Sequence, residues 1–181
     1  MKILKSVMLS ATAVAVAMLP IAGHAQSKNP VTNALKGQLQ RSSEIMVKAA
    51  EEMPADKYSF RPTPGSWTYG HLIMHVGDSN RMGCHWLTGY PAAPKSDLTP
   101  TSPKAELVAS LKSSFAYCKK AIATFNDSKL SGMVPFYGGH KLSAAAVLLM
   151  VSGDWENHYA QQAAYLRRNG MLPPTAHHGK P

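Results

Sequence analysis

The stretch AAAVLLMVSGDWENHYAQQAAYLRR, residues 144–168, carries the clearest helical pattern in the chain. Spaced at 3.6 residues per turn, its apolar residues fall on one helix face, and Asp154 and His158 lie near the centre of that face, about 40° apart. An isolated carboxylate in such a face is costly unless it is paired, hydrogen-bonded or bound to a metal, and an i, i+4 Asp/His pair is a common half of a metal site. The stretch therefore predicts a core helix and the place of a functional site.

The same periodicity predicts three further helices, over residues 30–53, 67–88 and 103–125. No segment has the pattern of a strand pair. We therefore expect an all-α fold, a four-helix bundle. The connections between the helices are about ten to fifteen residues long, so a crossover topology is as compatible with the sequence as simple antiparallel hairpins.

The helix starts are predicted from residues with capping side chains. Ser66 is expected to cap the second helix and Ser143 the fourth. For the third helix, Ser102 is followed by Pro103 and Glu106, which is the pattern of a capping box with a proline in the first turn.

The first 25 residues have the composition of a secretory signal peptide. Lys2 and Lys5 precede an apolar, small-residue run over 6–21, and Ala25 is a residue that signal peptidase accepts at the cleavage site. The run is short for a membrane span and no stop-transfer pattern follows it. We expect cleavage after Ala25, no stable membrane insertion of the mature chain, and a periplasmic or secreted location; an uncleaved N-terminal anchor is the alternative.

Residues 26–176 are long enough for one domain with its own core, and residues 177–181 are predicted to be a disordered tail. The formal net charge of +9 is dispersed, since Lys and Arg never occur in runs longer than two. A nucleic-acid groove is therefore not expected, and the predicted partner is a small-molecule substrate. Both a monomer and a homodimer are compatible with the sequence.

The second helix supplies a third ligand candidate, because His75 lies on its apolar face, which is expected to point into the bundle. Together, His75, Asp154 and His158 make a set of two imidazoles and one carboxylate. Such a set leaves positions open for water or substrate and suits zinc, nickel, iron(II) or manganese. A metal-free hydrogen-bonded network of the same residues is the alternative.

Two other histidines are candidates for supporting roles. His71 lies one turn before His75 and is a candidate to contact a ligand residue or to bind as a fourth ligand. His140 lies in the glycine-rich connection before the last helix and is a candidate proton shuttle. Because long connections often form the mouth of a site, we expect substrate to enter at a bundle end near Tyr58, Trp67 and His140.

The chain has two cysteines, Cys84 and Cys118. In an exported protein an even count favours a disulfide, and closing this loop would stabilise the fold by about 3 to 4 kcal/mol. Cys118 lies on the core stripe of the third helix and Cys84 points away from His75, so the bond requires the third helix to pack on the far side of the second. Two buried thiols are the alternative; a catalytic thiol is not expected.

Three segments carry recognisable motifs in order. They are MPADKYSFRP at residues 53–62, SWTYGHLIMH at residues 66–75, and the end of the last helix, where six residues separate His158 from Tyr165-Leu166-Arg167. Each motif is weak alone. Together they resemble the DinB/YfiT-like superfamily of four-helix-bundle metalloenzymes, over essentially the whole mature chain.

That resemblance implies a metal bound by three histidines, one from the second helix and two spaced i, i+4 on the fourth. His75 and His158 occupy two of these positions, and Asp154 stands at the third. Some members are transferases that use a low-molecular-weight thiol, so the resemblance implies a metal-dependent transferase or hydrolase-type enzyme with a divalent metal and such a thiol as cofactors. The departure at Asp154 favours the other class, a non-catalytic bundle that binds a metal or small ligand, or whose site is degenerate.

Overall fold

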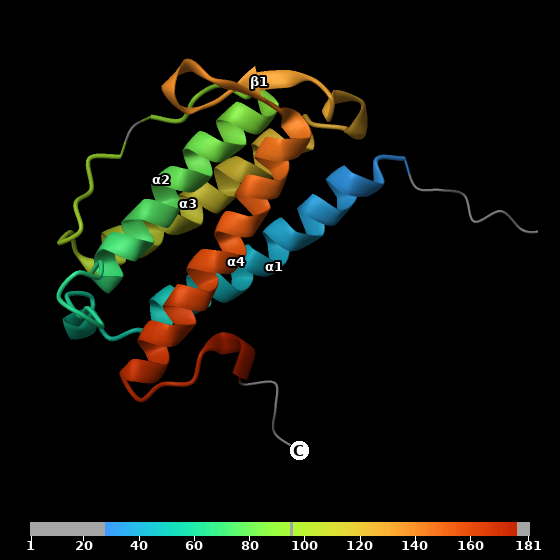
Figure 1. Ribbon diagram of the computed structural model, residues 1–181. Coiled ribbons are helices and arrows are strands. Elements are labelled where there is room, and N and C mark those ends of the chain that lie inside the picture. Colours follow the sequence, from blue (N-terminus) through green and yellow to red (C-terminus); the bar gives the residue numbers. More distant parts are fainter. Residues whose placement is uncertain (1–27, 95, 177–181) are drawn as a thin grey trace, which may run out of the picture.

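The computed structural model describes residues 28–94 and 96–176, and four helices dominate it (Figure 1). The helices are α1 (Pro30–Glu52), α2 (Tyr69–Thr88), α3 (Lys104–Ala123) and α4 (Ala144–Arg168). The predicted all-α four-helix bundle is confirmed. The predicted signal peptide and C-terminal tail lie outside the described residues.

Each helix packs against two others. α2 contacts α3 and α4 on one side of the bundle, and α1 contacts the same two helices on the other side. α2 and α3 run parallel, because Gly70 meets Leu107 near their starts and Cys84 is bonded to Cys118 near their ends. The connection between them must therefore return along the length of the bundle, as Figure 1 shows. The long connections thus serve a crossover topology.

The prediction that the chain has no strand pair was wrong. β1 (Met133–Pro135) and β2 (Lys141–Ser143) form an antiparallel hairpin between α3 and α4, with Val134 opposite Leu142. Strands of three residues are too short to show an alternating pattern. Glycines such as those of this segment indicate a turn, but they do not indicate the strands on either side of it. Gly138 and Gly139 adopt φ values of 64° and 78° at the turn, which a residue with a side chain rarely adopts. The hairpin lies over the C-terminal end of α2 and the N-terminal end of α4 (Figure 1).

Two of the three predicted caps are corrected by the structure. Ser143 caps α4 by accepting a hydrogen bond from a backbone N–H of the first turn. α2, however, begins at Tyr69 and is capped by Thr68, whereas the predicted cap, Ser66, pairs with a hydroxyl in the preceding turn. The Ser102 hydroxyl accepts from the backbone of the preceding turn, so no capping box forms at α3. In both segments the Ser hydroxyl forms its hydrogen bond within the turn that precedes the helix, so it does not cap the first turn of the helix.

The bundle interior contains the predicted apolar stripes. One face of α1 and the residue that follows the helix are buried: Leu35, Leu39, Ser42, Met46, Ala49 and Met53. The predicted apolar face of α4 is buried as well, with Trp155 and Leu166 almost fully so. Within the described residues, no helix combines the length and apolarity that crossing a bilayer would require.

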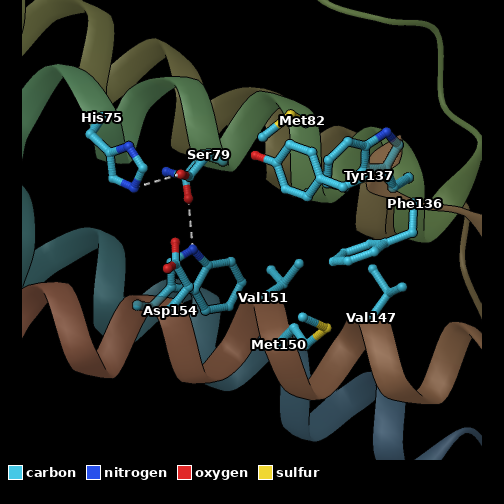
Figure 2. Close-up of a pocket in the computed structure, with 13 residues that line it drawn as sticks. His75, Ser79, Met82, Phe136, Tyr137, Val147, Met150, Val151 and Asp154 are labelled. Atoms are coloured by element: carbon cyan, nitrogen blue, oxygen red, sulfur yellow. Dashed lines mark hydrogen bonds between the residues drawn. The ribbon is translucent and has the colours of Figure 1, made fainter. Parts of the chain in front are cut away.

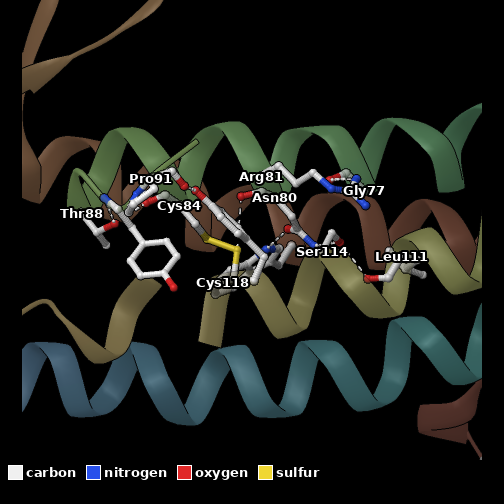
Figure 3. The surroundings of a disulfide bond; sticks show 12 residues. Gly77, Asn80, Arg81, Cys84, Thr88, Pro91, Leu111, Ser114 and Cys118 are labelled. Carbon is white, nitrogen blue, oxygen red and sulfur yellow. Dashed lines mark hydrogen bonds between the residues drawn. A yellow bond between two sulfur atoms is a disulfide. The ribbon is translucent and has the colours of Figure 1, made fainter. Parts of the chain in front are cut away.

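The predicted disulfide between Cys84 and Cys118 is confirmed, with the two Cα atoms 5.4 Å apart (Figure 3). Both cysteines are fully buried. A second link lies nearby, where the Arg81 guanidinium donates to the Ser110 hydroxyl and carbonyl. α3 is therefore fixed to the side of α2 that faces away from His75, as the sequence required.

The start of α2 is tightly packed against the crossover connection, and this makes Gly70 sensitive to substitution. A Cβ atom at Gly70 would lie 2.5 Å from the carbonyl oxygen of Pro100, a backbone atom that cannot move aside cheaply. We expect Gly70→Ala to lower the free energy of unfolding by about 1 to 3 kcal/mol. Gly153→Ala is the control, since nothing lies within 4 Å of its added Cβ, and it should raise stability by up to about 1 kcal/mol. Urea denaturation measures both; equal effects would contradict the tight approach.

Candidate metal centre

The three predicted ligand residues meet where α2 packs against α4. One ligand atom from each of His75, Asp154 and His158 lies within 4.8 Å of the other two. The Nε2 atom of His158 is 3.1 Å from Asp154 Oδ1, and the rings of His75 and His158 meet edge to face with centroids 4.9 Å apart. In Figure 2, His75 and Asp154 face one another across the gap between the two helices.

The burial of the pair on α4 differs from the prediction. The His158 side chain is 6% exposed, but that of Asp154 is 37% exposed. Asp154 therefore lies at the rim of the apolar face and not at its centre, because a pocket opens between α2 and α4 at this level. The partly hydrated position removes much of the cost that burying an unpaired carboxylate would carry.

The donor set fits a divalent cation. Ligands bound tetrahedrally at 2.0–2.1 Å from an ion lie about 3.4 Å apart; the His158–Asp154 pair, at 3.1 Å, has this spacing, and the three ligand atoms together lie within 4.8 Å of one another, so a small inward movement would close them on an ion. The other ring nitrogen of His158, Nδ1, is buried without a hydrogen-bond partner among the described residues. Such an orphaned atom costs about 1 to 3 kcal/mol, so the stability of the core does not explain a histidine at this position.

His75 is held by neighbours on its own helix and on the segment before it. The Ser79 hydroxyl lies 3.2 Å from Nε2 of His75, and the Trp67 ring lies 4.7 Å from the imidazole. Burial, and next the nearby His158, lower the pKa of His75. A lowered pKa favours the neutral ring, the form in which histidine binds metals.

Neither supporting histidine belongs to the three-residue ligand group. His71 stacks on Trp67 with ring centroids 4.4 Å apart, and the same indole lies against the His75 ring. His140 is exposed beside the turn of the hairpin and does not line the pocket.

The predicted entrance near Tyr58, Trp67 and His140 was wrong. Tyr58 is buried, and its hydroxyl donates to the carbonyl of Ala50 at 2.6 Å. Burial raises the pKa of Tyr58 well above its usual value. The three residues cannot share one bundle end, because the 20-residue α2 separates Trp67 from the hairpin by about 30 Å.

A cavity of about 240 Å³ extends from the candidate metal centre along the gap between α2 and α4. His75, Ser79 and Asp154 form its polar end (Figure 2). Apart from Asn80, its other walls are glycine, aromatic or apolar: Met82, Gly83, Trp86, Phe136, Tyr137, Val147, Met150, Val151 and Trp155. In the connection before α4 the sequence pointed to His140, and the hairpin brings the nearby Phe136 and Tyr137 over Trp86.

A buried polar network, which the sequence reasoning missed, fixes α2 against α4 beside this cavity. The Trp155 indole N–H donates to Asn80 Oδ1 at 2.7 Å, and the Asn80 side-chain amide donates to the Ser114 hydroxyl at 2.9 Å. The available signal was a single asparagine within the predicted second helix. Because the network joins three helices about one turn from the ligand residues, it holds their spacing.

Comparison with known proteins agrees with this fold. A family model described as the DinB superfamily matches residues 38–162. No functionally curated protein matches the chain significantly.

Among solved structures, a DinB-like protein from Bacillus cereus ATCC 10987 is 15% identical, with a TM-score of 0.66 over 78% of this chain and 95% of that one. YfiT from Bacillus subtilis, described as a probable metal-dependent hydrolase with an unusual four-helix bundle topology, is 16% identical, with a TM-score of 0.60 over 77% and 88% of the two chains.

A mycothiol-dependent maleylpyruvate isomerase is 17% identical, with a TM-score of 0.56 over 70% of this chain and 58% of that one. At these identities the structures establish a shared fold, and the family assignment rests on the match over residues 38–162. The chain belongs to the DinB superfamily.

Proposed function

We propose that the protein is an exported metal-dependent enzyme in which His75, Asp154 and His158 hold one divalent cation. The observation that carries the proposal is the meeting of these side chains, with ligand atoms within 4.8 Å of one another, at the polar end of a cavity. The metal dependence ascribed to YfiT supports it. The disulfide supports a periplasmic or secreted location, because such bonds persist in oxidising compartments.

A cation at this position would act as a Lewis acid and lower the pKa of a bound water or thiol. His75 and His158 would each present one ring nitrogen, and Asp154 would offset part of the positive charge. The open side of the group faces the cavity, where a substrate and a low-molecular-weight thiol would enter. The reaction class we propose is hydrolysis or thiol-dependent transfer, and the ligand set suits zinc, nickel, iron(II) or manganese.

A second candidate function is binding without catalysis. The exposure of Asp154, together with its place where the resembled pattern has a third histidine, favours this class. In that case the bundle would hold a metal or a small ligand and perform no reaction.

Metal analysis tests the proposed cation site. Protein purified without a histidine tag should contain one equivalent of a divalent metal, or should take up one after treatment with a chelator and addition of zinc, nickel, iron(II) or manganese. Failure of all four metals to bind would contradict the proposed function.

Substitutions at Asp154 give a graded prediction. Asp154→Asn should weaken zinc binding by at least about tenfold, because the charged ligand is lost, whereas Asp154→His should keep or strengthen it by completing a three-histidine set. Since Asp154 is partly exposed, both variants should keep the parent's melting temperature to within a few degrees. Calorimetric zinc titration of the three proteins measures the effect, and equal affinity in the parent and the Asn variant would remove Asp154 from the ligand set.

A further inference from the structure

The cavity beside the candidate metal centre is divided into two chemically different ends. Its polar groups gather at one end, around His75 and Asp154. At the other end, Trp86, Phe136 and Tyr137 contact one another with ring centroids 4.5 to 5.4 Å apart, in tilted or edge-to-face arrangements. Clusters of this kind accept a further planar ring with favourable geometry.

Among the described residues that line this cavity there is no lysine or arginine, and the one carboxylate is that of Asp154. Arg81 lies on α2 close in sequence to the residues that line the cavity, but its guanidinium donates to the Gly77 carbonyl and to Ser110 of α3 and does not line the cavity. An anionic group on the body of a ligand would therefore find no side chain of opposite charge in this lining. In the metal-free protein, an anionic head group would also meet the carboxylate of Asp154.

The size of the cavity limits the ligand further. An apolar cavity of about 150 Å³ is large enough to bind benzene, and this cavity measures about 240 Å³. It therefore has room for one or two fused rings and a short polar substituent. In Figure 2, the hydroxyl of Tyr137 points along the cavity towards Ser79 and His75, so the polar substituent would find its partners at that end.

We propose that this cavity binds a small molecule whose planar apolar body of one or two rings carries no anionic group and whose single polar group is directed towards His75 and Asp154. In treating this ligand as a substrate, the inference rests on the function proposed above. The cavity itself does not require the cation, so its ligand preference is testable in metal-free protein.

The test is calorimetric titration of chelator-treated protein with naphthalene-2-methanol and, as its charged counterpart, naphthalene-2-carboxylate. The alcohol should bind with one site per chain, and the carboxylate at least about tenfold more weakly. Phe136→Ala should weaken binding of the alcohol by at least about tenfold. The matched control is Phe60→Ala, which removes an equally half-buried ring that contacts Tyr165 instead, and it should bind the alcohol like the parent.

Three outcomes would overturn the inference: no binding of the alcohol, binding of the carboxylate as tight as that of the alcohol, or unchanged binding in Phe136→Ala. None of these depends on a metal, so they are distinguishable from failure of the proposed cation site. If the parent protein binds the alcohol but no zinc, the inferred ligand class is supported and only the proposed metal chemistry is contradicted.

A different observation concerns α4 beyond His158. Nδ1 of His158 and Oε1 of Gln162 are both buried without hydrogen-bond partners in the described part of the chain. The two residues are four positions apart on α4, which makes them neighbours on one face of the helix. The amide nitrogen of Gln162 is anchored by donating to the Met46 carbonyl at 3.3 Å, which leaves the oxygen as an acceptor.

We infer that Gln162 is a positioning residue, whose side-chain oxygen accepts the Nδ1 proton of His158 when Nε2 binds the cation. A ligating imidazole usually donates its second N–H in this way, which fixes the ring's tautomer and orientation. The inference rests on the proposed function, because only a His158 that binds through Nε2 needs this acceptor.

Zinc affinity of the Gln162→Met variant tests the role, with Gln161→Met as the matched control on the neighbouring position. Gln162→Met should bind zinc about 10 to 100-fold more weakly than the parent, and Gln161→Met like the parent. A purely structural role would lower the melting temperature while leaving the zinc affinity of the folded protein unchanged, and that result would overturn the inference. A parent that binds no zinc would instead overturn the proposed function and the positioning role together.

Discussion

Replacing His75 with alanine is expected to lower the affinity for zinc by more than about 100-fold. The substitution removes one of three protein ligands, and loss of a residue that only supports a ligand already costs about 10 to 100-fold. His75 is half-buried and lines the cavity, so its removal should leave the helix and the fold intact. Competition with a chromophoric chelator measures the affinity.

His71→Ala is the matched control for that variant. His71 is on the same helix, one turn away, and its ring stacks on Trp67 outside the ligand group. It should change zinc affinity by less than about tenfold. Equal losses in the two variants would show that the aromatic stack, and not direct ligation by His75, governs zinc binding.

Breaking the disulfide should produce the largest loss of stability. With a sequence separation of 34 residues between Cys84 and Cys118, the chain-entropy model gives a loss of about 3 to 4 kcal/mol, and the melting temperature should fall by on the order of 10 °C. The variants are Cys84→Ala, Cys118→Ala and the double substitution, compared by thermal and urea unfolding under oxidising conditions.

Because either single substitution opens the bond, the double variant should be only slightly less stable than the single ones. Reduction of the parent should reproduce most of the effect. Additive losses in the double variant, or a parent whose stability does not respond to reduction, would show that packing of the two side chains and not the covalent link stabilises the α2–α3 pair.

The sequence was most informative where a long apolar helix face contained an ionisable side chain that a hydrophobic core does not need. The 25-residue α4 has enough turns for its apolar face to stand out, and His158 is conspicuous on that face. The same reasoning on α2 placed His75 inside and Cys84 on the opposite side, which fixed the order in which α3 and α4 pack around α2. Helical periodicity carries this information because it defines directions as well as helix boundaries.

What the sequence did not predict depends on how separate segments pack together. The exposure of Asp154 follows from a cavity whose walls include the hairpin, and three-residue strands leave no pattern to read. Equally, the role of Phe136 depends on its contact with Trp86, some 50 positions away in the chain. Asn80 was visible as a polar residue on α2, but its partners lie on two other helices.

The position of a bound ion tests the account most directly. Crystals of the protein grown with zinc, and measured on both sides of the zinc absorption edge, should show one anomalous peak per chain about 2.0 to 2.2 Å from a ligand atom of each of His75, Asp154 and His158. A zinc ion held elsewhere, at His85 or His140 for example, with these three side chains unliganded, would contradict the account.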